Sequence, residues 1–414
     1  MNHFITNIKI NKLLHLCNID IPVTDQERPH LIITGKNGSG KTILLNAIAD
    51  FLGIIRNDIL FSWLSFEKKQ KYLQEQMQNT ALSYYDRKNV QSQLKQINQK
   101  KEKLNSKVDI SFSNVVELVK KYNANGFIMT FYQASRKPEM LEPTNPTKPD
   151  LKNKNEITNH FSDQFLYFLS DLKIQEALAR NEKQYADADE IKKWFDDFEI
   201  LLKKIYMDEG LILEFNYRDY SFKILTEGKS FKFTQLSDGF SAILEIVTDL
   251  ILKMQDGNTL SRNYKKEGIV LIDEIETHLH LELQKIILPL LTRVFPNIQF
   301  IVTTHSPFVL NSIDNAVAYD LEHRTMLTDL EEYSYESLAE GYFGVDTESN
   351  YAKIQLKKFK ELLEKQEPSA LDKIAIKQFA DDFDKIPEAI SPIIVGQYRQ
   401  LANTYADIIK EARR

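Results

Sequence analysis

The sequence predicts an α/β fold that contains an inserted helical hairpin and ends in a helical tail. First, short apolar runs of strand length alternate with helix-length segments along most of the chain. Second, a glycine-rich segment separates one such run from the helix that follows it. Third, one polar stretch has apolar residues at helical spacing. We expect a two-part head at residues 1–65 and 126–325, the hairpin at residues 66–125 and the tail at residues 326–414.

Composition limits the classes of protein to which the chain can belong. Its 414 residues are 43% hydrophobic, which is enough to bury a substantial core. The net charge of −6 argues against a protein that coats nucleic acid with its whole surface. Cys17 is the one cysteine, so an internal disulfide is excluded and a reducing compartment, the cytoplasm, is expected. We expect no signal peptide, because the N-terminus has no basic region followed by an apolar core. No apolar run approaches about 18 residues, so membrane contact is expected only through a partner.

Strand and helix patterns follow one another in a regular order. Phe4–Asp20 alternates apolar and polar residues, and His30–Thr34 is a short apolar run. Ile43–Leu52 predicts a helix that is apolar on nearly every face, as expected for a helix enclosed by other elements. The later elements are expected at Gly126–Tyr132 (strand), Asn159–Lys204 (helices), Leu211–Phe215 and Tyr220–Leu225 (strands), Ser237–Lys253 (helix), Gly268–Ile272 (strand), Leu281–Val294 (helix), Gln299–Thr303 and Ala316–Asp320 (strands).

The polar stretch from about Phe66 to Tyr122 predicts the inserted helical hairpin. Val90, Leu94, Ile97 and Leu104 recur within it at spacings of 4, 3 and 7 residues, as in a helix. Residues 67–121 contain 12 Lys and Arg against 6 Asp and Glu, so this segment is basic inside an acidic chain. Two interpretations stay open: a solvated helical face, or a contact surface for DNA, RNA or a protein partner.

A P-loop motif occupies the glycine-rich segment between a predicted strand and a predicted helix. Its residues are Gly35, Lys36, Asn37, Gly38, Ser39, Gly40, Lys41 and Thr42. Its glycines let backbone N–H groups turn inward around phosphates, and the following helix adds its positive N-terminal end. Lys41 can reach the β- and γ-phosphates, and the Thr42 hydroxyl can ligate Mg²⁺. From Asn37 to Thr42 the sequence therefore predicts a binding site for ATP with Mg²⁺.

Two carboxylates end the apolar run Ile269–Ile272. The tip of a buried parallel strand lies beside the nucleotide in folds of this kind. Asp273 is then expected to hold the Mg²⁺ shell, and Glu274 to orient or deprotonate the attacking water. The alternative is that these residues cap the next helix.

Two further polar residues follow apolar strands. His305 comes after Gln299–Thr303 and is predicted to sense the γ-phosphate, the alternative being a buried structural histidine. Gln133 follows the strand that ends at Tyr132, where its amide oxygen can reach Mg²⁺ or the attacking water. An ordinary loop glutamine is an equal alternative at that position.

The segment Leu236–Phe240 opens a predicted helix about 30 residues before the acidic strand. Together, the P-loop, this segment, the Asp-Glu strand and the histidine resemble the ABC-class ATPases, whose signature begins Leu-Ser-x-Gly. The resemblance implies an ABC-type P-loop ATPase head. It also implies that Ser237 and Gly239 contact the γ-phosphate bound to the opposite subunit, so the chain is expected to form a head-to-tail homodimer with ATP in two shared sites.

The resemblance extends to a narrower group. Asp273–His280 is similar to the acidic and Leu-His pattern of non-transporter ABC ATPases near RecF, SMC and OLD-like proteins, which implies that Glu276–His280 forms a loop that communicates across the dimer. Phe240 departs from the usual Gln or Glu after the signature glycine. The Ser-Asp-Gly-aromatic version resembles ATPases of bacterial phage-defence systems of the Septu and retron types. Gly341–Asp346 is similar to the tail of such ATPases.

These observations favour a cytosolic ATPase whose dimer switches a separate effector, a nuclease or toxin, in antiviral defence. The acidic run Asp381–Asp384 lies in a helical pattern, so no nuclease is expected within the tail. One alternative is a DNA-repair or chromosome-associated ATPase that binds DNA directly, although the insertion is too short for the long arms of SMC-type clamps. A transporter's nucleotide-binding subunit is disfavoured by the Leu-His segment and the long tail.

Overall fold

The protein is described from a computed structural model. The structure describes residues 4–23, 30–55, 69–78, 83–104, 107–136, 140–145, 147–152, 156–255, 264–327, 330, 335, 337–338, 350–365, 367–385 and 392–414. The chain divides into two compact units, Met1–Tyr335 and Glu336–Arg414, and each is considered by itself.

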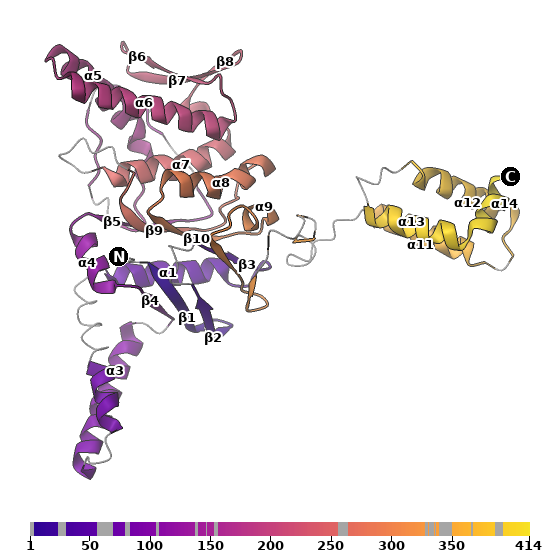
Figure 1. Ribbon diagram of the computed structural model, residues 1–414, viewed down its shortest axis with the longest axis horizontal. Coiled ribbons are helices and arrows are strands. Elements are labelled where there is room, and N and C mark those ends of the chain that lie inside the picture. The colour runs from indigo at the N-terminus through magenta and orange to yellow at the C-terminus, as the bar shows by residue number, and fades with distance from the viewer. Residues whose placement is uncertain are drawn as a thin grey trace. The chain divides into compact units, whose positions relative to one another are not determined.

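A six-stranded sheet forms the centre of the first unit (Figure 1). Its order is β12-β11-β3-β10-β9-β5, and all neighbours are parallel except β12 with β11. The strands are β3 (His30–Thr34), β5 (Phe127–Tyr132), β9 (Glu267–Ile272), β10 (Ile298–Thr303), β11 (Ala316–Asp320) and β12 (Thr325–Leu327). This parallel-rich sheet, with helices on both faces, confirms the predicted α/β fold. Because the strands are parallel, the segments after β3, β5, β9 and β10 leave the sheet at the same edge.

The helix after the P-loop lies between two sheets. α1 (Lys41–Ile55) covers one face of the six-stranded sheet, and an antiparallel sheet of order β2-β1-β4 covers the other side of the helix. The strands of this second sheet are β1 (Ile5–Leu13), β2 (Leu16–Pro22) and β4 (Val108–Phe112). Leu44, Leu45 and Ile48 are fully buried as a result, which explains why the helix is apolar on nearly every face.

The opposite face of the six-stranded sheet is covered by α7 (Asp238–Met254) and α8 (Leu281–Val294) (Figure 1). Above them lie α5 (Phe165–Asn181), α6 (Tyr185–Tyr206) and a third sheet of order β6-β7-β8. Its strands are β6 (Ile212–Asn216), β7 (Ser221–Thr226) and β8 (Lys229–Lys232). Stacked rings of Phe195 and Phe222, 6.3 Å apart, join α6 to this sheet.

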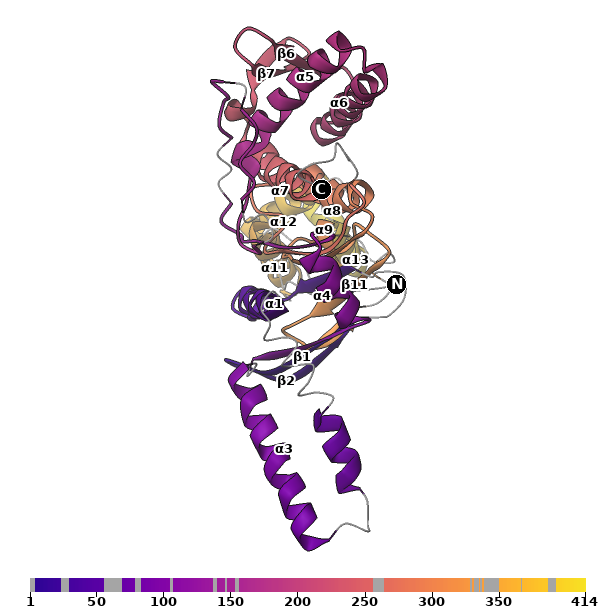
Figure 2. The same cartoon turned by 90° about the vertical axis from the view of Figure 1, so that its left-hand side faces the viewer.

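The inserted hairpin consists of helical residues 69–77 and α3 (Tyr84–Leu104), which lie side by side (Figure 2). Its apolar seam contains Leu73, Val90 and Ile97, with Met77 and Leu94 packed against them. The Gln70 amide donates a hydrogen bond of 3.0 Å to the Asn98 side chain across the pair. The helical spacing seen in the sequence therefore marks the seam between these two helices.

The end of the predicted hairpin belongs to the head instead. β4 pairs with β1, Ile110 opposite Ile8, and α4 (Val115–Asn123) buries Leu118 in the core beneath the six-stranded sheet. The alternation Val-Asp-Ile-Ser-Phe is that of a half-buried strand, and the Asn114 side chain accepts the Glu117 N–H to cap α4. The basic excess lies before this segment, in residues 67–107, and the prediction extended the insertion past it.

The second unit is a helical bundle, as predicted for the tail. It contains α11 (Asn350–Leu363), α12 (Ala370–Phe383), α13 (Pro392–Thr404) and α14 (Ala406–Arg413) around Phe359 and Ile376. Within the acidic run Asp381–Asp384, Arg413 forms ion pairs with the first and last residues. The Gly341–Asp346 segment lies outside the described residues. No helix in the described ranges is long and apolar enough to cross a bilayer.

Candidate nucleotide-binding site

The P-loop leaves β3 through backbone that only glycine adopts readily. Gly35 has φ +135° and Gly40 has φ +102°. A Cβ at Gly35 would lie 2.9 Å from the Ser39 Oγ, and one at Gly40 would lie 2.9 Å from Leu16 Cδ1. The positive φ therefore favours glycine at both positions, and a Cβ at either would displace a neighbouring side chain. The two glycines hold the loop tightly enough to form a phosphate cradle at the start of α1.

Lys41 is the first residue of α1 and is only 5% exposed. Its ammonium donates to the carbonyl oxygens of Gly35 at 2.8 Å and Lys36 at 3.1 Å. Burial lowers the pKa of Lys41, and nearby carboxylates, Glu274 foremost, partly oppose that shift. The positive charge of Lys41 thus lies at the P-loop, beside the carboxylates at the end of β9.

One threonine, Thr303, contacts both residues that carry the carboxylates after β9, Asp273 and Glu274. Asp273 is buried and accepts a 2.6 Å hydrogen bond from the Thr303 hydroxyl of β10. The same hydroxyl accepts the N–H of Glu274 at 2.8 Å. Glu274 has φ +45°, so the chain turns sharply between the two residues. Thr303 was not singled out from the sequence, yet it fixes the turn that separates them.

A pocket of about 160 Å³ opens where these strands end. Its lining is formed by Asn37, Gly38, Gly40, Lys41, Thr42, Ile43, Glu274 and His305. Ser39 lies behind it, buried at 4% exposure. Two segments that each lie more than 200 residues after the P-loop in the sequence thus meet it at one edge of the sheet. The structure brings together the residues proposed for phosphate binding and for hydrolysis.

His305 is half-buried and held by its backbone. Its N–H donates to the Glu276 carboxylate, which also accepts the Thr304 hydroxyl at 2.8 Å. Burial lowers the pKa of His305, and Lys41 lowers it further. The imidazole is therefore neutral near pH 7, so its ring can offer one donor and one acceptor at the pocket. Glu276 belongs to the loop that was expected to communicate across the dimer. Its hydrogen bonds to Thr304 and His305 connect that loop to the histidine.

Five predicted residues do not line this pocket: Ser39 and Asp273, which are buried beside it, and Gln133, Ser237 and Gly239. Gln133 is placed beside Asp273 by the pairing of Tyr132 with Ile272, and its side chain is exposed. Ser237 is the exposed N-cap residue of α7 and makes no side-chain cap. Gly239 is buried, and a Cβ there would lie 2.8 Å from the His278 carbonyl oxygen. Within one chain, the signature segment therefore packs on the loop after β9 and not on the P-loop.

Arg136 is a residue that sequence reasoning missed. It is 5% exposed and donates to the carbonyl oxygens of Asp273 and Glu274, each at 3.1 Å, and of Ile275 at 3.4 Å. Burial lowers its pKa, and Glu245 of α7 gives the largest opposing effect. Arg136 therefore clamps the backbone that carries both carboxylates. Its position three residues after Gln133 was the one available signal.

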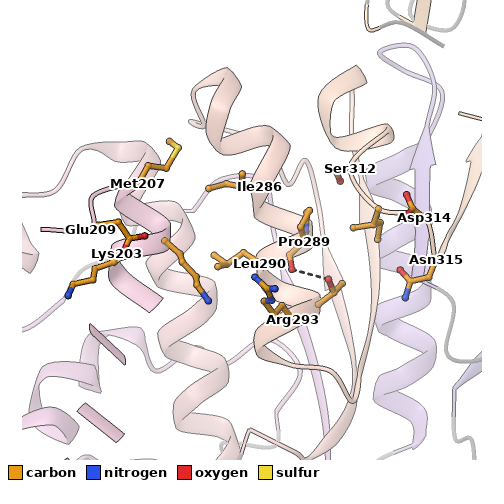
Figure 3. A pocket seen from close by; sticks show the side chains of 13 residues that line it. Lys203, Met207, Glu209, Ile286, Pro289, Leu290, Arg293, Ser312, Asp314 and Asn315 are labelled. Atoms are coloured by element: carbon orange, nitrogen blue, oxygen red, sulfur yellow. Dashed lines mark hydrogen bonds between the residues drawn. The ribbon is translucent and has the colours of Figure 1, made fainter. Parts of the chain in front are cut away.

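A larger hollow of about 830 Å³ lies elsewhere in the same unit, between the end of α6, α8 and the loop after α9 (Pro307–Leu310) (Figure 3). Met207, Pro289, Leu290 and Arg293 are among the residues that line it. Lys203 on its wall already pairs with Glu199 at 3.0 Å. None of the residues predicted to act in catalysis lines this hollow, so size does not identify the chemical site.

Comparison with known proteins gives matches to one family model and to defence ATPases. Residues 74–311 match the model described as "AAA domain, putative AbiEii toxin, Type IV TA system". The Septu protein PtuA of Bacillus mycoides (strain KBAB4) is 28% identical over 331 residues, covering 77% of this chain and 41% of that protein. The Retron Ec83 probable ATPase of Escherichia coli is 49% identical over 82 residues, covering 20% of this chain and 15% of that one.

Among solved structures, an SMC head bound to the C-winged helix domain of ScpA aligns with a TM-score of 0.39 and 12% identity. It covers 80% of this chain and 100% of that chain. The chain spans about two fifths of the length of the Septu relative, and a smaller part of the retron ATPase.

Proposed function

Because this chain belongs to the family described as "AAA domain, putative AbiEii toxin, Type IV TA system", we propose that it hydrolyses ATP as a homodimer. In this proposal the nucleotide lies between two heads, and its hydrolysis switches a separate effector protein, a nuclease or toxin, in antiviral defence. The similarity to a Septu protein and to a retron ATPase supports the defence role.

The observation that carries the proposal is the single pocket shared by the P-loop, Glu274 and His305. Lys41 would bind the β- and γ-phosphates with its ammonium, and Glu274 would orient or deprotonate water for attack on the γ-phosphate. His305, neutral near pH 7, would hydrogen-bond the γ-phosphate or that water. Lys41 is held at the loop by the Gly35 and Lys36 carbonyls, and Glu274 by the turn at Thr303, so both groups are positioned before a second head docks.

The residues present fit Mg²⁺, which takes oxygen ligands and keeps several waters. Thr42 places a hydroxyl at the pocket, and Asp273 supplies a buried carboxylate with Oδ1 bonded to Thr303. Gln133, the first residue after the neighbouring strand β5, stands beside Asp273 as a further oxygen ligand. When bound, the ion would neutralise phosphate charge.

The dimer is supported by what the pocket lacks within one chain. Ser237 and Gly239 do not line it, although the ABC-type resemblance assigns them to the γ-phosphate. Since Ser237 is exposed at the N-terminus of α7, it can bind an anion presented by a second copy. Gly239 packs on the His278 carbonyl, so an anion bound at the N-terminus of α7 would shift the position of the loop after Glu274.

Mixing of inactive variants tests this proposal. Lys41→Ala damages the P-loop half of a shared site, and Ser237→Arg damages the signature half, so each alone is expected to lose ATP hydrolysis. Mixed together, they form heterodimers with one intact site, and phosphate release is expected to recover in part.

The matched control is a mixture of Lys41→Ala with Glu274→Gln. Both defects then lie in the P-loop half, so no intact site can form and activity stays absent. Failure of the first mixture to recover, with both variants folded, would refute the shared site. Full activity of Ser237→Arg alone would do the same.

A further inference from the structure

The outward face of α3 carries aromatic and basic side chains that the hairpin does not use for packing. Tyr84 and Tyr85 are 76% and 83% exposed, and their rings meet edge to face at 6.0 Å. Lys88 and Lys95 are also exposed. The seam between the two helices is closed by Val90 and Ile97 on the opposite face of α3, packed with Leu73 of the other helix. Folding of the hairpin therefore does not explain these side chains.

Helix geometry aligns them. Tyr84, Lys88 and Lys95 are separated by four and seven residues, so they follow one line along α3, with the two lysines about 10 Å apart. Asp86 lies off this line, where its carboxylate accepts the Ser83 hydroxyl. Across residues 69–104 there are eight Lys and Arg against three Asp and Glu, in a chain of net charge −6. Within the described part of the chain, Lys88 and Lys95 form no ion pair.

We propose that this face, Tyr84, Tyr85, Lys88 and Lys95, binds single-stranded nucleic acid. Unpaired bases stack on exposed aromatic rings, and the phosphates of the same strand meet a line of lysines beside them. An acidic protein surface would satisfy the lysines but would leave the two adjacent tyrosines without a role. A duplex would satisfy the lysines too, yet its bases are already stacked on one another. The proposal does not rest on ATP hydrolysis, because none of these residues lines the nucleotide pocket.

Fluorescence anisotropy with labelled dT20 and rU20, without nucleotide, tests the inference on the full chain. Tyr84→Ala with Tyr85→Ala is expected to weaken binding about 10-fold or more, because stacking on two rings is lost. Tyr84→Phe with Tyr85→Phe keeps the rings and is expected to bind normally. Lys88→Glu with Lys95→Glu is expected to reduce the slope of log affinity against log salt by about 1.4. The two oligonucleotides distinguish DNA from RNA as the source of the strand.

A matched control changes a similar surface in the other unit. Tyr351 is 72% exposed on α11, and Lys357 and Lys358 follow it on the same helix in exposed positions. Tyr351→Ala and Lys357→Glu with Lys358→Glu are expected to leave binding unchanged. Absence of binding to either oligonucleotide at low salt would overturn the proposal. So would normal binding by the double alanine variant, or equal affinity for a blunt duplex of the same length.

Discussion

At the carboxyl edge of the six-stranded sheet, Asp273 and Arg136 are buried and hydrogen-bonded. On the outward face of the hairpin, Tyr84, Lys88 and Lys95 are exposed to solvent. The first region uses burial to hold charges in place and to shift their pKa values, as at Lys41 and Glu276. The second has a seam of a few apolar residues and leaves its charges exposed to solvent.

The difference follows from what each region has to recognise. Phosphoryl transfer requires donors and acceptors fixed within fractions of an ångström, because the catalytic groups must already be oriented before charge develops. Recognition of a flexible strand requires only charge and flat apolar surface at suitable spacing. We therefore expect substitutions at the sheet edge to act on nucleotide chemistry alone, and substitutions on α3 to act on strand binding alone.

The largest expected effect is that of Lys41→Ala. Removing a buried ammonium from the cradle leaves phosphate charge uncompensated, so ATP affinity should fall about 100-fold or more. Calorimetric titration with ATP measures it, and binding of dT20 to the hairpin should not change. Lys36→Ala is the control, because Lys36 lies in the same loop with an exposed side chain. Unchanged ATP affinity in folded Lys41→Ala would remove the P-loop assignment and with it the contrast between the two regions.

A smaller effect is expected for Arg136→Lys, which tests positioning and not binding. A lysine keeps the charge but cannot donate to three successive carbonyls in the same plane, so Glu274 should lose its fixed direction. We expect kcat to fall about 10- to 100-fold while ATP affinity stays within about 3-fold. Arg293→Lys, at an exposed arginine of α8, is the control. Equal loss of affinity and turnover would indicate a purely structural role for Arg136.

Much of the site was predictable because its residues end strands. The apolar runs before Asp273 and His305 have strand length, and parallel strands place their ends at one edge. The bounds of α8 and β11 agreed with the sequence pattern residue for residue. The partner of the signature segment stays a prediction, since Ser237 lies away from the pocket of its own chain.

What the sequence did not reveal depends on partners far along the chain. β4 is buried because β1, about 100 residues earlier, pairs with it, and no local signal outweighed its basic surroundings. Arg136 has its role only because the backbone of Asp273 and Glu274 comes within 3.1 Å of it. The polar strand β8 (Lys229–Lys232) was missed because strand formation there depends on pairing with β7.

The smallest expected effect concerns acid stability beneath the P-loop. His30, the first residue of β3, is buried, and its Nδ1 accepts the N–H of Phe300 at 3.1 Å. Burial lowers the pKa of His30 to about 4, against about 6.5 in the unfolded chain. Between these values the unfolded state binds the proton and the folded state does not. The contribution of His30 is therefore complete above pH 6.5 and is lost progressively as the pH falls towards 4.

Between pH 7.5 and pH 5.5 this amounts to about 1.4 kcal/mol of unfolding free energy. Urea unfolding of the wild type and of His30→Asn at both pH values measures it. Asn keeps an acceptor near the position of Nδ1 but does not titrate, so its loss on acidification should be smaller by that amount. The hairpin contains no histidine between residues 69 and 104, so this source of acid sensitivity is confined to the head. Equal losses in both proteins would mean that His30 is protonated in the folded head, contrary to its burial and its accepted hydrogen bond.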